Sequence, residues 1–114
     1  MRASRALPAL PSALQRAFAK LGQDLSAARR RRRLTMALAA ERALISRATL
    51  SRVERGDPSV SMGIYATVLH IYGLGDRVGE LADLGSDEIG RALELERLPK
   101  RVRRTSRIPD GGGP

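Results

Sequence analysis

The stretch that decides the fold of this chain is Leu34–Gly56, LTMALAAERALISRATLSRVERG. It contains two short segments of helical character, residues 36–43 and residues 47–55. Thr35 and Ser46 precede them, and both residue types favour a helix N-cap because the hydroxyl accepts a hydrogen bond from a free backbone N–H. The final glycine suits a left-handed helix stop. The spacing therefore predicts two short helices joined by a turn, the geometry of a helix-turn-helix.

A helical pattern precedes this stretch and another follows it. The first begins at Ser12 or near Lys20 and ends at about Arg32, and its apolar face comprises Leu21, Leu25 and Ala28. The second has Ser61 as N-cap and stops at Gly73, and its apolar stripe comprises Met62, Tyr65, Val68, Leu69 and Tyr72. We interpret both stripes as core and place His70, which lies off the stripe, on the surface.

Two more helices are predicted towards the C-terminus. Asp76 caps one that extends to residue 84 and carries Val78, Leu81 and Leu84. Ser86 caps the other, residues 87–97, where the candidates for burial are Ile89, Leu93 and Leu95. No segment has the pattern of a strand. The predicted class is all-α, a five-helix domain around the helix-turn-helix with an extra C-terminal helix and a basic tail.

These patterns divide the chain into four parts. Residues 1–19 form a flexible basic arm, or one that is helical from residue 12, and residues 20–84 form the helix-turn-helix domain. Residues 85–98 hold the C-terminal helix, and residues 99–114 form a basic, largely disordered tail. A chain of 114 residues is long enough for one small domain with its own core.

Charge is distributed unevenly along the chain, whose formal net charge is +9. The balance is +10 over residues 1–56, −6 over residues 57–96 and +5 over residues 97–114. A basic first half points to a polyanion as partner. A solvated helix face explains the run Arg29–Arg33 equally well when that run is taken alone.

Several classes of site are excluded by composition. Cysteine is absent, which excludes disulfides and thiolate metal sites and favours a reducing compartment such as the cytoplasm. His70 alone cannot build a metal cluster, so we expect no metal and no cofactor. No apolar run approaches the roughly 20 residues that span a bilayer. Because there is no nucleophile–base pair and no glycine-rich phosphate loop, we expect no enzyme and assign no catalytic residue.

The segment 47–55 is the expected recognition helix for double-stranded DNA. Leu50 and Val53 point to the core, and the opposite side carries the candidate base-reading residues Arg47, Ala48, Ser51 and Arg52. An arginine fork matches guanine O6 and N7, and an alanine methyl can contact the methyl group of thymine. A solvated helix surface is the alternative interpretation of the two arginines.

Phosphate contacts are expected around this helix. The Ser46 cap leaves backbone N–H groups directed outward, where a phosphate can bind. Basic side chains at the end of the first helix supply affinity that depends on salt and not on sequence. The candidate phosphate-binding residues are Arg30, Arg31, Arg32, Arg33, Thr35, Ser46, Thr49 and Arg55. One such domain reads few base pairs, so we expect a homodimer on a palindromic operator.

The stretch Leu34–Gly56 resembles the Cro/phage-repressor (XRE) family, whose pattern is roughly LTQxELAxxxGISxxTLSRxExG. The residues that match are Leu34, Thr35, Ala40, Ile45, Ser46, Thr49, Leu50, Ser51, Arg52, Glu54 and Gly56. The resemblance covers about residues 20–84 and implies a lambda-repressor-like fold, a repressor function and an orienting pair between Arg29 and Glu54. The chain departs from the pattern at Arg33, Met36, Leu38, Ala39 and Leu44. Those departures affect a phosphate contact of the second helix and the geometry of the turn.

A second stretch, EIGRALELERLPKRVR at residues 88–103, resembles the tail of HipB-type antitoxins. That resemblance implies a HipA-type kinase toxin as partner and a protein associated with the bacterial nucleoid. A protein-interaction module that neutralises a toxin, with DNA binding secondary, is therefore the alternative function. An RNA or single-strand binder is disfavoured, because such proteins stack bases on aromatic side chains and this chain has one Phe and two Tyr.

Overall fold

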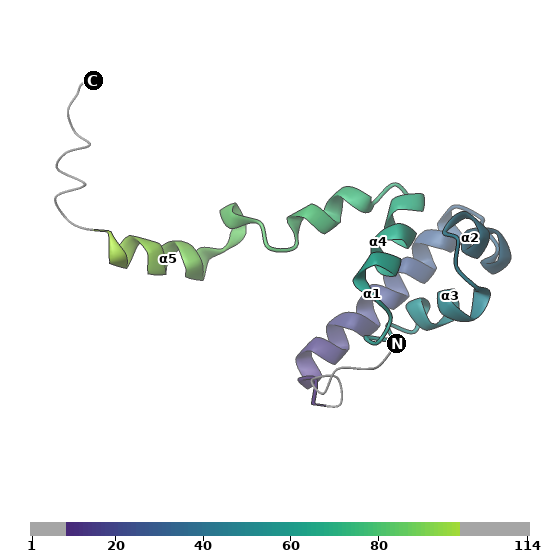
Figure 1. Ribbon diagram of the computed structural model, residues 1–114, viewed down its shortest axis with the longest axis horizontal. Helices are drawn as coiled ribbons and strands as arrows, with labels where there is room; N and C mark the ends of the chain where they lie inside the picture. The colour runs from purple at the N-terminus through teal and green to yellow at the C-terminus, as the bar shows by residue number, and fades with distance from the viewer. Residues whose placement is uncertain (1–8, 99–114) are drawn as a thin grey trace, which may run out of the picture. The chain divides into compact units, whose positions relative to one another are not determined.

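The computed structural model describes residues 9–98, and all regular structure among them is helical. The all-α class is therefore confirmed for this part of the chain (Figure 1). The chain divides into two compact units, one that ends at Val78 and one that begins at Gly79. The expectations for the start of the basic arm and for the basic tail fall on residues 1–8 and 99–114, outside the described residues.

The first unit contains four α-helices, α1 (Ser12–Arg31), α2 (Met36–Arg42), α3 (Arg47–Glu54) and α4 (Met62–Ile71). The first helix thus begins at the earlier of the two starts that the sequence allows. Three of the predicted hydroxyl caps are present: Thr35, Ser46 and Ser61 each accept a hydrogen bond from the backbone N–H three residues later, at 3.1, 3.0 and 3.2 Å. These caps define where α2, α3 and α4 begin. The N-cap of α1 is Pro11, which makes no side-chain cap bond, and Ser12 is the first residue of the helix.

The core of this unit lies where α1, α2, α3 and α4 meet. Its largest fully buried side chains are Leu25, Leu50, Val53 and Val68, from α1, α3 and α4. The fully buried side chains of α2 and its C-cap are all small, Ala39 and Ala40 in the helix and Ala43 directly after it. Burying each large aliphatic side chain stabilises the fold by roughly 1.5–3 kcal/mol. The alanines keep α2 close to the helices against which it packs, which are α3 and α4.

All four helices of this unit end in the same way. The backbone N–H of the third residue after each helix bonds back to the carbonyl five residues earlier, as in Ile45 to Ala40 at 3.0 Å and Asp57 to Arg52 at 3.1 Å. This Schellman arrangement places one residue in the left-handed region. That residue is glycine in two cases and a side-chain-bearing residue in the other two: Arg33 (φ 56°), Leu44 (φ 58°), Gly56 (φ 73°) and Gly73 (φ 78°).

Two glycines allow α1 to approach the end of α3 closely. A Cβ added to Gly22 would lie 2.5 Å from the backbone nitrogen of Gly56 and 2.7 Å from the carbonyl oxygen of Glu54. A Cβ on Gly56 would overlap the backbone carbonyl of Phe18. Both distances are to backbone atoms, which have little freedom to move. The pair therefore sets the distance between α1 and the predicted recognition helix.

The structure corrects the prediction for residues 76–84. In place of an α-helix it has a 3₁₀ helix, η1 (Gly75–Glu80), and then a second one, η2 (Leu84–Ser86). Leu81 and Leu84 are 72% and 81% exposed. An α-helix over this segment would include Gly79, and the two leucines give it no buried face to offset the cost of nucleation. In α4, Met62 is also exposed and not core, whereas Tyr65, Val68 and Tyr72 are buried as predicted.

The last helix, α5 (Glu88–Arg97), lies in the second unit. Its N-cap is Asp87, which accepts a hydrogen bond from the Gly90 N–H at 2.9 Å, and not Ser86 as predicted. The predicted buried residues are exposed: Ile89 by 76%, Leu93 by 51% and Leu95 by 62%. That prediction is wrong for the single chain, because a helix of ten residues in so small a unit has no core against which to pack.

Candidate nucleic-acid interface

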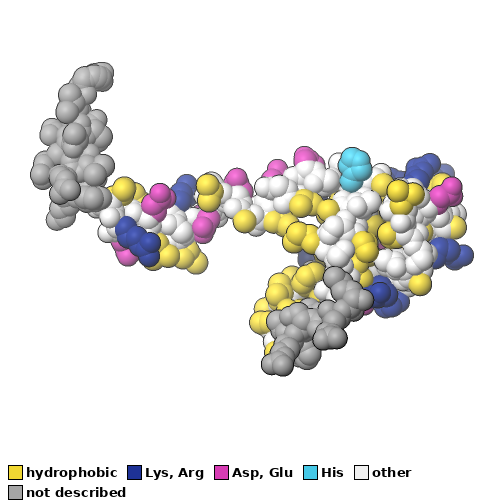
Figure 2. Space-filling model, in the orientation of Figure 1, with side chains coloured by type: hydrophobic (Ala, Val, Ile, Leu, Met, Phe, Trp, Pro, Cys, Tyr) yellow, Lys and Arg dark blue, Asp and Glu magenta, His cyan; other side chains and the backbone are white. Residues whose placement is uncertain are grey.

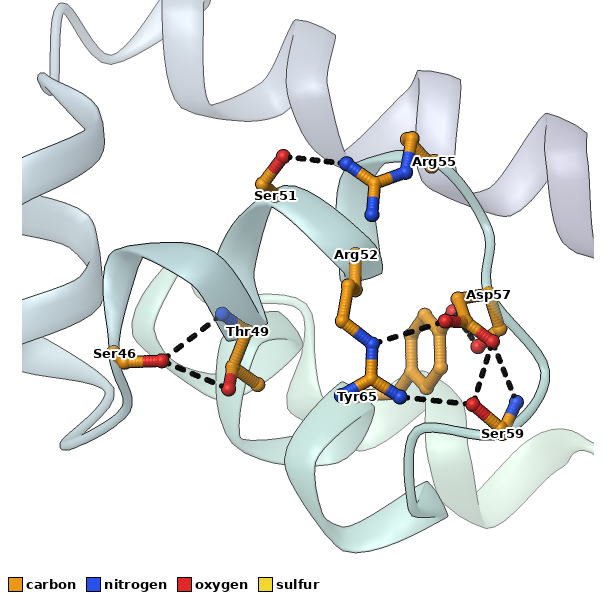
Figure 3. Close-up of polar contacts among 8 residues, drawn as sticks. All are labelled: Ser46, Thr49, Ser51, Arg52, Arg55, Asp57, Ser59 and Tyr65. Atoms are coloured by element: carbon orange, nitrogen blue, oxygen red, sulfur yellow. Dashed lines mark hydrogen bonds and ion pairs between the residues drawn. The ribbon is translucent and has the colours of Figure 1, made fainter. Parts of the chain in front are cut away.

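The third helix is fixed on one side and open on the other. Leu50 and Val53 are fully buried, while Arg47 and Ala48 at its start are exposed. Ser46 accepts from the Thr49 N–H and donates its hydroxyl proton to Thr49 Oγ1 at 2.9 Å (Figure 3). The Ser46 hydroxyl thus orders the N-cap and the first turn of α3, where the side chains of Arg47 and Ala48 are exposed.

Arg29 and Glu54 meet in a two-pronged ion pair. Arg29 Nε donates to Glu54 Oε2 at 2.7 Å and Nη2 donates to Oε1 at 3.2 Å. The side chains are only 13% and 12% exposed. Arg29 Nη1 also donates to the carbonyl of Leu34 at 2.9 Å, so one guanidinium ties α1 to both ends of the helix-turn-helix. The hydrogen bonds to Glu54 raise the pKa of Arg29, which therefore stays charged.

A buried tyrosine lies beneath the basic end of α1. The Arg32 guanidinium lies 5.7 Å from the centre of the Tyr72 ring and donates to the carbonyl of Ala28 at 2.9 Å. Tyr72 is 3% exposed, and its hydroxyl has no hydrogen-bond partner among the described residues. Burial raises the pKa of this hydroxyl, and the charge of Glu54 adds to the effect. Arg32 is thus held over the core by its cation–π contact.

The remaining arginines of the run are on the surface. Arg30, Arg31 and Arg33 are exposed, and Thr35 lies beside them at the start of α2. Figure 2 shows Lys and Arg side chains gathered around the end of this unit that carries α2 and α3. The arginines of the run and the start of α3 therefore belong to one unit, although they are 14 or more residues apart in the sequence.

The end of α3 carries contacts that the sequence did not predict. Arg55, which is exposed, donates from Nη1 to Ser51 Oγ at 2.8 Å. Arg52 is directed to the following loop: Nε donates to Asp57 Oδ2 at 3.0 Å, and Nη2 donates to Ser59 Oγ at 2.8 Å (Figure 3). Two of the four residues assigned to base reading, Ser51 and Arg52, thus have partners within the chain.

Asp57 organises this loop. Its Oδ1 accepts from the Ser59 N–H at 2.9 Å and from the Ser59 hydroxyl at 2.7 Å. The hydrogen bonds from Ser59, followed by that from Arg52, lower the pKa of Asp57 to about 2. The Tyr65 hydroxyl donates to the Asp57 backbone carbonyl at 2.7 Å. The sequence Asp-Pro-Ser favours an Asx turn, which is the one signal that could have pointed to this loop.

One comparison with known proteins bears on this arrangement. A family model described as a helix-turn-helix domain matches residues 20–84. The chain belongs to this family. The helix-turn-helix domain makes the protein a DNA-binding regulator, in agreement with the exposed, arginine-bearing face of α3. No curated protein and no solved structure matches the chain. Among the described residues, none of the helices combines the length and the apolar character that crossing a membrane requires.

Proposed function

We propose that this helix-turn-helix protein is a sequence-specific repressor of the Cro/phage-repressor type that inserts α3 into the major groove of double-stranded operator DNA. The observation that carries the proposal is the division of α3 into a buried side, Leu50 and Val53, and an exposed start, Arg47 and Ala48. A recognition helix contacts base edges with its N-terminal residues. The bidentate pair between Arg29 and Glu54 supports the resemblance to that repressor type, which implied it.

We assign base reading to Arg47, Ala48, Ser51 and Arg52. Arg47 is exposed at the start of α3 and can present a planar fork to a guanine. Ala48 offers a methyl group to thymine. The bond from Arg55 orients the Ser51 hydroxyl, and this hydroxyl suits a direct or water-mediated contact.

The residues that we assign to phosphate binding lie around α3. The exposed positions Arg30, Arg31, Arg33 and Thr35 form one side of the contact, and Arg32 adds its charge from its place over Tyr72. Ser46, Thr49 and Arg55 flank the base-reading residues. The capped N-terminus of α3 adds its own positive end. These contacts give affinity for any duplex, and base reading selects among sequences.

The functional organisation follows the four parts of the sequence. Residues 20–84 bind one half-site, and two copies bind the halves of a palindrome about one helical turn apart. Residues 1–19 and 99–114 add positive charge, and residues 85–98 carry the C-terminal helix. Binding to chromosomal DNA associates the protein with the nucleoid in the bacterial cytoplasm.

A selection of binding sites from random duplexes tests the proposal. The selected site should be a palindrome, and it should bind the full chain at least about a thousandfold more tightly than random duplex at physiological salt. Arg31→Ala should weaken binding to both duplexes alike and lower the salt slope by about one, whereas Arg52→Ala should change the base preference. Equal affinity of the wild type for selected and random duplex contradicts the proposal.

A second function, neutralising a kinase toxin of the HipA type, is favoured by a different observation. Large apolar side chains of residues 79–98 are exposed, and Figure 2 shows several along α5. They are Leu81, Leu84, Ile89, Leu93, Leu95 and Leu98. Exposed apolar groups of this size suit a protein contact. Co-purification with a kinase encoded by the adjacent gene tests this function, and Ile89→Ser with Leu93→Ser should abolish it without affecting DNA binding.

A further inference from the structure

The guanidinium of Arg52 is held by one of its two edges. The side edge, formed by Nε and Nη2, donates to Asp57 Oδ2 at 3.0 Å and to Ser59 Oγ at 2.8 Å. A guanidinium has five N–H groups, so three remain, and they include both N–H groups of Nη1. The side chain is 42% exposed. The end edge, formed by Nη1 and Nη2, is therefore available to a ligand while the side edge stays bound.

The groups that hold Arg52 are themselves held. Ser59 donates twice to Asp57 Oδ1, from its N–H at 2.9 Å and its hydroxyl at 2.7 Å, which leaves Oδ2 for Arg52 (Figure 3). Tyr65, which is 4% exposed, donates to the backbone carbonyl of Asp57 at 2.7 Å. The loop is thus fixed to the core through α4, and it fixes Arg52 in turn.

A flexible arginine loses side-chain freedom when it binds a base, whereas one that is already oriented loses little. The end edge of a guanidinium matches the two acceptors of guanine, O6 and N7. We propose that Asp57 and Ser59 are positioning residues that hold the side edge of Arg52 and thereby present its end edge, Nη1 and Nη2, to a guanine in the major groove. This inference rests on the proposed function, because it names how one of its base-reading residues is oriented.

One substitution distinguishes this positioning role from a simple effect of charge, because the two predict opposite changes in DNA affinity. Asp57→Asn removes a negative charge near the DNA and by charge alone should tighten binding to every duplex. The Ser59 N–H and Arg52 Nε, however, bond to different oxygens of Asp57, and an amide has an NH₂ donor in place of one of them, so one of the two donors loses its acceptor. If Asp57 positions Arg52, the substitution should instead weaken binding to the selected site.

The experiment measures binding of the full chain to three kinds of duplex. They are the selected site, a series in which its guanines are exchanged one at a time, and a random duplex. We expect Asp57→Asn to weaken the selected site about tenfold and the random duplex less than about twofold, with the loss confined to one guanine position. Ser59→Ala should give a smaller loss at the same position. Arg52→Lys should lose the preference fully, since an ammonium has no planar edge. Glu41→Gln, an equal charge change at an exposed position of α2, should lower neither affinity.

A thermal unfolding curve of each variant checks that it is folded at the assay temperature. Asp57→Asn binding as tightly as the wild type, or more tightly, overturns the inference, and so does an equal loss on all duplexes. A second readout needs no DNA: NMR of the Arg52 Nε–H should show slow exchange in the free wild type and fast exchange in Asp57→Asn. Equal exchange in both overturns the inference. A wild type that shows no preference among duplexes contradicts the proposed function instead.

Discussion

Removing the charge of Glu54 should weaken the attachment of α3, the proposed recognition helix, to α1. In the wild type, this carboxylate accepts two hydrogen bonds from Arg29, at 2.7 and 3.2 Å, and the two side chains are 13% and 12% exposed. Glu54→Gln keeps one acceptor oxygen and the shape of the side chain. It loses one charge-assisted hydrogen bond and leaves the arginine charge without a counter-charge, a cost of about 1.5–3 kcal/mol.

For a folding unit of this size, such a loss lowers the melting temperature by about 6–24 °C, since 1 kcal/mol corresponds to roughly 4–8 °C. Urea unfolding followed by helical circular dichroism measures the free energy of unfolding directly. Glu54→Ala should cost more, about 3–5 kcal/mol, because it leaves the buried charge of Arg29 without a counter-charge and with only the Leu34 carbonyl as acceptor. Joint replacement, Arg29→Met with Glu54→Leu, should recover most of the loss, because no buried charge then remains unpaired.

The matched control is the ion pair between Lys20 and Asp24, also on α1, with an N–O distance of 2.7 Å and side chains 75% and 62% exposed. Asp24→Asn should cost at most about 0.5 kcal/mol, because water competes for both groups. If Glu54→Gln changes the free energy of unfolding by no more than this control does, the pair does not hold α3, and the reasoning from its burial is refuted.

Three further predictions concern stability. Gly22→Ala should destabilise by about 1–3 kcal/mol, because its Cβ would lie 2.5 Å from the Gly56 nitrogen; Gly63→Ala, whose Cβ would have 3.9 Å to its nearest neighbour, should not destabilise, and equal melting temperatures would refute the close approach. Leu44→Gly should stabilise by about 0.5–1 kcal/mol, because Leu44 is 91% exposed at φ 58° and a left-handed leucine costs about 1–2 kcal/mol; a destabilised variant in urea unfolding would mean that Leu44 packs. The pKa of Asp57 falls from 3.8 to about 2 on folding, so this carboxylate stabilises the fold above pH 4, and about 1–2 kcal/mol should be lost between pH 4 and pH 2; the same loss in Asp57→Asn would rule out Asp57 as its source.

Much of the first unit could be predicted because its signals are local. The hydroxyls of Thr35, Ser46 and Ser61 bond to N–H groups three residues away, so a sequence window of four residues contains the information. The core faces follow from helical periodicity. Leu44, one of the departures that the sequence places in the turn, lies two residues beyond the end of α2 and has a left-handed conformation, with φ 58°.

The features that were missed depend on contacts between segments. Gly22 looked like an ordinary helix residue, and its role appears only because the backbone of Gly56 lies against it. Arg52 has a favourable spacing for base contact, but Asp57 and Ser59 in the next loop determine where its guanidinium points. Residues 76–84 carry a cap and apolar spacing typical of an α-helix, yet Leu81 and Leu84 stay exposed, and the segment forms 3₁₀ turns instead.

The most direct test of DNA reading by α3 is the base preference of Arg47→Ala, because this arginine is exposed at the start of α3. Fluorescence anisotropy should be measured with the selected palindrome, with every single-base variant of it, and with random duplex. Arg47→Ala should lose about 1–3 kcal/mol of discrimination at one base pair of each half-site, with near-normal binding to random duplex. A variant that keeps the full base preference of the wild type would contradict the claim that the start of α3 reads DNA.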